Sequence, residues 1–154
     1  MAKKLPSAPR IQHKKALHRF EVLEKLSCGI ALQGTEVKSL REGQGSLDEA
    51  YARIERGEVW LIGFHIGPYS HGRTQAHVPK RTRKLLLQRR EIKKWEPKVT
   101  QRGLTLVPLE VYFNERGLAK VILALARGKT HRDKREDLKK AEHKREMDRA
   151  MRRR

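Results

Sequence analysis

The residues best suited to chemistry in this sequence are its lysines and arginines. They number 37, against 18 aspartates and glutamates, and give a net charge of +19. Residues 1–19, 73–94 and 127–154 hold the excess, whereas residues 20–72 are net acidic. Clustered ammonium and guanidinium groups pair with phosphates. Solvated surface charge without a partner is the simpler alternative, but three separate basic blocks favour a nucleic-acid partner, and a folded RNA fits best.

Patterns for catalysis or metal binding are absent from the sequence. It contains no zinc-protease, P-loop, nucleophile-elbow or paired-cysteine motif. The seven histidines lack the close spacing of metal ligands, and we expect His71 and His77, in a polar loop, to be exposed to solvent. We therefore predict a protein that is not an enzyme and that has no metal site and no cofactor. An RNA-processing enzyme with an unrecognised site is the alternative.

The single cysteine and the acidic residues also have structural explanations. Cys28 excludes an intrachain disulfide, and its strand-like surroundings predict a buried or half-buried thiol. Helix capping and surface placement explain the four clustered acids, which are Glu36, Glu42, Asp48 and Glu49.

The length of 154 residues suits one domain. The longest apolar run, residues 121–126, is too short to cross a membrane. The basic N-terminus lacks the apolar stretch of a secretory signal. We expect a soluble, cytoplasmic protein.

Apolar periodicity in the first half of the chain predicts mainly strands. Residues 20–32 form one bent strand or two strands, with Gly29 at the bend. Thr35 is a candidate N-cap for a short helix that Gly43 ends. Residues 51–66 are predicted to form a hairpin, with Gly57 in its turn.

In the second half, residues 68–79 are expected to form a mobile loop. Thr82 is a candidate cap for a second helix that Pro97 ends. Residues 103–113 and 118–126 are predicted to form a second hairpin, in which Pro108 marks an edge or a bulge.

These elements indicate a mainly β protein with helices. We expect an antiparallel sheet curled into a small OB-fold-like barrel flanked by short helices. Residues 1–12 would be a flexible basic arm, residues 13–127 the RNA-binding barrel and residues 128–154 a basic tail. The tail has ion pairs at helical spacing, but these are too weak to hold a lone polar helix. It is therefore expected to be disordered when free and helical only when bound.

Six short blocks along the chain resemble the SmpB (small protein B) family of bacterial trans-translation. They are GTEVKSLR (34–41), YARI (51–54), TRKLLL (82–87), GLTLVPL (103–109), LALARGK (123–129) and DKR (133–135). The blocks occur in the family's order from about residue 14 to the end, and together they are highly specific.

The resemblance implies a non-enzymatic adaptor that binds the tRNA-like domain of tmRNA. Such an adaptor promotes alanylation of tmRNA and its delivery to stalled ribosomes, where the tail enters the empty decoding site and mRNA channel. The implied partners are tmRNA and small-subunit ribosomal RNA, with elongation factor Tu and alanyl-tRNA synthetase reached through tmRNA. No membrane is involved and a monomer is expected. A general ribosome-associated RNA-binding protein or RNA chaperone is the alternative.

The resemblance also implies two sets of RNA-contacting residues. The tmRNA set consists of Lys14, Lys15, His18, Thr35, Glu36, Lys38, Arg41, Arg81, Arg83, Lys84 and Leu86. The ribosome set lies in the tail and consists of Lys129, His131, Arg132, Asp133, Lys134 and Arg135. By spacing alone, Leu86 is equally well a core leucine, and Lys38 and Arg41 are equally well solvated charges. Asp133 is expected to orient its basic neighbours.

Three positions depart from the family pattern. His13 replaces an asparagine that touches tmRNA, Ser27 replaces a glutamate that helps hold the RNA loop, and Arg132 replaces a histidine or tyrosine that stacks on a ribosomal base. A guanidinium plane can still stack on a base.

Overall fold

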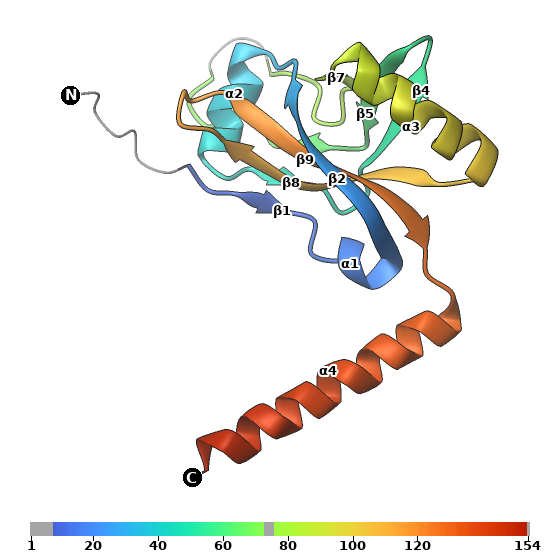
Figure 1. The fold of residues 1–154 in the computed structure, drawn as a ribbon. Coiled ribbons are helices and arrows are strands. Elements are labelled where there is room, and N and C mark those ends of the chain that lie inside the picture. Colours follow the sequence, from blue (N-terminus) through green and yellow to red (C-terminus); the bar gives the residue numbers. More distant parts are fainter. Residues whose placement is uncertain (1–7, 73–75, 154) are drawn as a thin grey trace.

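The structure is a computed structural model that describes residues 8–72 and 76–153 (Figure 1). Most of its strands belong to one antiparallel sheet, from which the last helix extends (Figure 1). In chain order the elements are β1 (Ile11–Gln12), α1 (Ala16–Arg19), β2 (Phe20–Ile30), α2 (Gly34–Arg41), β3 (Gly45–Ser46), β4 (Tyr51–Glu55), β5 (Glu58–Ile62), β6 (His65–Ile66), β7 (Arg83–Leu86), α3 (Arg89–Arg102), β8 (Thr105–Phe113), β9 (Ala119–Gly128) and α4 (His131–Arg152).

The large sheet closes on itself. Its strands pair in the order β8–β4–β5–β7–β2–β9, and β9 pairs back to β8. The β2–β9 and β8–β9 ladders are long. In the described part of the chain, by contrast, a single residue pair, Ala52 with Leu106, joins β4 to β8, and two pairs join β2 to β7. The predicted mainly β fold is confirmed. The expected barrel is a ring-like sheet in which the β4–β8 and β2–β7 pairings are short.

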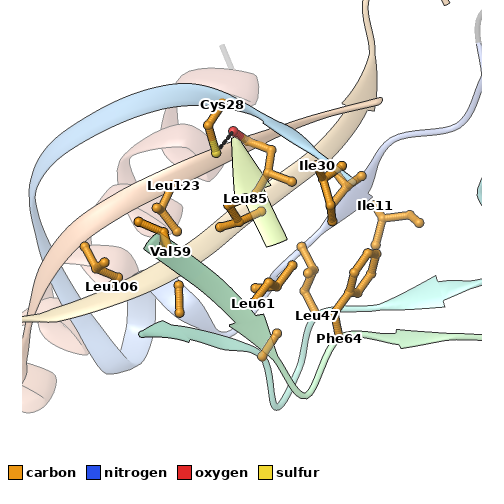
Figure 2. Close-up of a cluster of buried hydrophobic side chains, with 14 of the residues drawn as sticks. Ile11, Cys28, Ile30, Leu47, Val59, Leu61, Phe64, Leu85, Leu106 and Leu123 are labelled. Atoms are coloured by element: carbon orange, nitrogen blue, oxygen red, sulfur yellow. Dashed lines mark hydrogen bonds between the residues drawn. The ribbon is translucent and has the colours of Figure 1, made fainter. Parts of the chain in front are cut away.

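Apolar side chains from the strands fill the inside of this ring (Figure 2). On β5, Val59 and Leu61 are fully buried, whereas Trp60 between them is half-buried, because successive residues of a strand face opposite sides. Leu85 and Leu123 meet them from β7 and β9. Burial of one face of the long strands therefore produces the main core, and Ala16, Val107 and Ala126 form a second, smaller cluster.

Cys28 lies at the edge of this core and is 3% exposed. Its thiol donates to the carbonyl oxygen of Val121 at 3.5 Å (Figure 2). Burial raises the pKa of the Cys28 thiol to about 12. The predicted buried thiol is confirmed.

Both predicted hairpins are confirmed. Arg56 and Gly57 join β4 to β5 with φ values of 52° and 73°, which is the left-handed pair that a two-residue hairpin turn requires. The β8–β9 turn is held by the Asn114 side chain, which accepts from the Leu118 N–H at 2.9 Å. Pro108 stands at a register shift in the β8–β9 ladder, which confirms the predicted bulge.

The second predicted helix is wrong at its start. Residues Arg83–Leu86 form β7, which lies between β2 and β5. Pairing on both edges outweighs the helix-like spacing of the leucines. Helix α3 begins after Gln88, whose capping box with Glu91 satisfies the first N–H groups. Pro97 lies inside α3 and does not end it, because Trp95 and neighbouring apolar residues pack on the core.

The predicted end of the N-terminal arm and the predicted cap of the first helix are also wrong. Ile11 and Gln12 pair with β8 as β1, so this end of the expected arm belongs to the sheet, while residues 1–7 lie outside the described residues. Helix α2 is capped by Gln33 rather than Thr35, because the Gln33 N–H donates to Glu36 at 2.8 Å in a capping box. Gly43, with φ of 78°, ends this segment as predicted.

The basic tail forms α4, which stands away from the sheet (Figure 1). Thr130 caps it, and its hydroxyl accepts from the Asp133 N–H at 3.3 Å. None of its 22 residues, all of which the structure describes, is buried. The helix is the conformation expected for the bound tail, and its dependence on a partner stays a prediction.

Glu24 on β2 holds α3 against the sheet. Its carboxylate accepts from the Trp95 indole N–H at 2.7 Å and from Lys98 Nζ at 2.5 Å. These hydrogen bonds, with that of Lys98 the largest influence, lower the pKa of Glu24 from 4.5 to about 2. The carboxylate therefore stabilises the fold fully above pH 4.5, and the contribution disappears as the pH falls from 4.5 towards 2.

We expect Glu24→Gln to lower the free energy of unfolding by about 1–2 kcal/mol at pH 7, because a neutral amide accepts more weakly than a carboxylate. The difference from wild type should shrink between pH 4.5 and pH 2, as measured by urea unfolding at a series of pH values. Glu115→Gln, in the exposed β8–β9 turn, is the control. A difference that is constant down to pH 2 would contradict this role.

Candidate nucleic-acid interface

The surface that carries most of the predicted tmRNA residues is built on a buried ion pair. Glu36 of α2 and Arg83 of β7 are both fully buried, and the Arg83 Nε donates to a Glu36 carboxylate oxygen. The two other Arg83 nitrogens donate to the carbonyl oxygens of Phe64 at 2.7 Å and Pro79 at 3.1 Å. One guanidinium therefore joins α2, β7 and two connecting segments.

The electrostatics of this pair favour the ionised state of both groups. Burial alone would raise the pKa of Glu36, but the hydrogen bonds from Arg81, the Gln33 N–H and Arg83 bring it below its usual value. Burial lowers the pKa of Arg83, and Glu36 opposes this shift. A guanidinium remains protonated in a protein interior. The pair is thus a charged crosslink, and the expected surface position of Glu36 is wrong.

His77 adds hydrogen bonds to α2 and to β6. It is buried, so the expected solvent exposure of this side chain is also wrong. Its Nε2 donates to the Ile66 carbonyl oxygen at 3.0 Å, and its Nδ1 lies 3.0 Å from the Thr35 hydroxyl. His71, by contrast, is exposed as predicted. The described residues of the 68–79 loop contain no helix or strand, and residues 73–75 lie outside the described chain.

Around the buried pair, several of the predicted RNA residues reach the surface. Lys38 and Arg41 are exposed on α2. Arg81 is partly exposed and donates to Glu36 at 2.6 Å, and Lys84 pairs with Glu58 at 2.8 Å. Leu86 is 53% exposed, so it is not a core leucine. Accessible cations and one apolar side chain therefore lie on or next to the elements that the buried pair joins, whereas Arg83 and Glu36 themselves are inaccessible to an RNA.

The predicted tmRNA residues do not form one cluster. Lys14, Lys15 and His18 are exposed in and just before α1, at the start of β2, whereas α2 follows the end of this 11-residue strand (Figure 1). An RNA that contacts the accessible residues of both groups must therefore span the length of β2.

In the tail, the Lys129 side chain forms a hydrogen bond and an ion pair within the protein. Its ammonium donates to the Leu17 carbonyl oxygen at 2.7 Å and pairs with the Asp137 carboxylate, and its side chain is only 15% exposed. Asp133 accepts from the Thr130 hydroxyl at 2.8 Å, and this contact is the main cause of its lowered pKa. Asp133 is thus the N3 residue of the capping box of α4, in which Thr130 is the N-cap. The remaining tail residues that the resemblance implies are half-buried or exposed, namely His131, Arg132, Lys134 and Arg135.

The three departures from the family pattern occupy different environments. His13 is buried, and its Nδ1 donates to the Pro108 carbonyl oxygen at 3.0 Å, while its Nε2 has no partner among the described residues. Ser27 is exposed and lies 2.8 Å from the Tyr112 hydroxyl. Arg132 is 89% exposed, with Glu136 at 3.7 Å. Arg132 is therefore the departure whose guanidinium is open for stacking.

Sequence reasoning missed Tyr69, whose ring lies 5.5 Å from the Lys38 ammonium. An aromatic residue inside a polar loop was the available signal. Over residues 8–72 and 76–153, His, Cys, Asp and Glu side chains form no group of three that could hold a metal ion. The same residues include no helix with the length and apolar character to cross a membrane.

Comparison with known proteins gives matches over nearly the whole chain. The family model described as SmpB protein matches residues 10–153. The SsrA-binding protein of Syntrophobacter fumaroxidans is 53% identical over 143 residues, which cover 93% of this chain and 88% of that protein. The SsrA-binding protein of Chelativorans sp. is 47% identical over 154 residues, which cover 100% of this chain and 99% of that protein.

A solved structure described as "tmRNA-SmpB: a journey to the center of the bacterial ribosome" has a similar fold. The TM-score is 0.68 at 48% identity, with 85% of this chain and 95% of the other chain covered. The match to the family model spans all the strands and all four helices, α1 to α4. This chain therefore belongs to the SmpB family.

Proposed function

We propose that this protein binds tmRNA and acts with it in trans-translation, the rescue of stalled ribosomes. The observation that carries the proposal is membership of the SmpB family over residues 10–153, whose relatives are SsrA-binding proteins. The charge distribution supports it, because the described lysines and arginines of the three basic blocks are exposed or half-buried, with the exception of Arg83. Phosphates of a folded RNA are the ligands that such a surface pairs with.

The exposed cations indicate how the body of the protein, which is the sheet with α1 to α3, would bind RNA. Lys38, Arg41 and Arg81 offer cations to phosphates and Leu86 offers an exposed apolar contact, while Lys14 and Lys15 offer a second contact at α1. Arg83 and Glu36 act as positioning residues, because together they hold α2 against β7. The body would thereby bind the tRNA-like domain at two points along β2.

The tail supplies a separate contact. Helix α4 exposes basic side chains and buries none of its residues, so it is available to ribosomal RNA of the small subunit. In this proposal the protein is a cytoplasmic, monomeric, non-enzymatic adaptor that promotes alanylation of tmRNA. Elongation factor Tu and alanyl-tRNA synthetase are then reached through tmRNA.

A binding titration tests this proposal. The protein should bind the tRNA-like domain of tmRNA more tightly than an elongator tRNA, and its affinity should fall steeply with salt. The log–log slope is about −0.7 to −0.9 per phosphate contact. The double variant Lys14→Met/Lys15→Met should make the slope less steep by about 1 to 2 units.

The matched control is Lys139→Met/Lys140→Met, which removes two charges from α4 and should leave binding of the isolated tRNA-like domain almost unchanged. Equal affinities for the two RNAs would instead favour a general RNA-binding protein or RNA chaperone.

A further inference from the structure

The segment that follows β6 is hydrogen-bonded to residues that come just after α2. The Gly67 N–H donates to the Gln44 carbonyl oxygen at 3.0 Å. The Ser70 hydroxyl lies 3.2 Å from both carboxylate oxygens of Glu42. Residues 67–72 are therefore held at a defined position beside α2, although they form neither helix nor strand.

This segment presents two rings. Tyr69 is half-buried, with the Lys38 ammonium 5.5 Å from its ring centroid. The His71 ring lies 5.5 Å from that of Tyr69, centroid to centroid, at an interplanar angle of 51°. His71 is anchored at Nδ1, 3.0 Å from the Ser70 hydroxyl, yet its side chain is 77% exposed. An aromatic face is thus oriented and open to solvent.

Two cations stand beside these rings. Lys38 and Arg41 are exposed and three residues apart on α2, so they share one side of the helix. Among the described residues, neither forms an ion pair with a carboxylate. The Arg41 guanidinium lies over the Phe113 ring, 5.6 Å from its centroid, in a cation–π contact. Both charges are available to a phosphate.

We propose that His71 and Tyr69, together with Lys38 and Arg41, form a binding site for an unpaired nucleotide of the RNA. The base stacks on the open face of the His71 ring, and its phosphate pairs with Lys38 or Arg41. A base-paired helix hides the faces of its bases, so the base that stacks here is an unpaired one. The inference rests on the proposed binding of tmRNA and adds a contact that recognises an unpaired base.

The test is a titration of the full-length protein with the tRNA-like domain of tmRNA at several salt concentrations. His71→Ala should weaken binding by about five- to 150-fold with no change in salt slope, because stacking releases no counterions. His71→Phe should restore binding, because it keeps a ring. Lys38→Met should weaken binding and make the salt slope less steep by about 1. His143→Ala, at an exposed histidine of α4, is the matched control.

Fluorescence identifies the nucleotide. When each unpaired loop base is replaced in turn by 2-aminopurine, one position should lose emission on binding wild type or His71→Phe, but not on binding His71→Ala. Wild-type affinity of His71→Ala, with weakened binding of the Lys14/Lys15 variant, would overturn this site and leave the proposed function intact. Failure of His71→Phe to restore binding would also overturn it, since the Ser70 contact rather than the ring would then matter. Failure of the wild-type protein to prefer tmRNA over tRNA would remove the proposed function itself.

Discussion

Arg83→Met is expected to lower the free energy of unfolding by about 3–5 kcal/mol, as measured by urea denaturation at pH 7. The substitution leaves the Glu36 carboxylate fully buried with Arg81 as its remaining cationic partner. It also removes the Arg83 hydrogen bonds to the Phe64 and Pro79 carbonyl oxygens, although the Pro79 oxygen keeps the Ile66 N–H as a donor at 2.9 Å. A buried carboxylate with one cationic partner instead of two and the loss of two hydrogen bonds to carbonyl oxygens act in the same direction.

Two further variants make this expectation specific. Lys84→Met changes the next residue of β7, whose partly exposed ion pair with Glu58 should contribute less than about 1 kcal/mol. Glu36→Gln/Arg83→Met removes both charges and should recover part of the loss, which a double-mutant cycle would measure. If Arg83→Met and Lys84→Met were equally stable, the buried pair would not be the crosslink that holds α2 against β7.

Truncation after Gly128 is expected to separate binding from ribosome rescue. Because α4 buries none of its residues, its removal should leave the core intact and change the free energy of unfolding by about 1 kcal/mol or less. The small loss comes from Lys129, whose ammonium and N–H donate to the Leu17 and Arg19 carbonyl oxygens. The body should still bind the tRNA-like domain, whereas peptide tagging in a reconstituted translation reaction should be abolished.

The full-length protein with Lys139→Met/Lys140→Met is a useful companion, because it keeps the helix and removes two of the tail's charges. It should tag at an intermediate level. Loss of cooperative unfolding in the truncated protein would contradict a boundary at residue 128, and undiminished tagging would contradict a role of the tail on the ribosome.

Local features of the fold were predictable because their causes lie within a few residues. Gly57 and Gly117 supply the positive φ that their turns require, and both hairpins form where these glycines stand. Pro108 lacks the N–H that a regular ladder uses, and it lies at a bulge. The buried thiol of Cys28 likewise followed from the strand pattern around it.

The same reasoning failed where a neighbour distant in sequence decided the outcome. Residues 83–86 are a strand because β2 and β5 flank them, and no local signal shows this. Pro97 is tolerated within α3 because Trp95 is anchored by Glu24, which is 71 residues away in the chain. His77 is buried because Thr35 and Ile66 meet it.

By itself, the sequence determined that a nearly neutral apolar core would carry cationic surfaces for RNA, since charge and hydrophobicity are properties of the residues. Only the tertiary structure decided which charges face outwards. Glu36 and Arg83 neutralise each other inside the protein, whereas Lys38 and Arg41, on the same segment as Glu36, stay exposed. Whether an ionic side chain binds a partner or holds the fold depends on which opposite charge the folded chain brings within hydrogen-bonding distance, and that distance is set by packing.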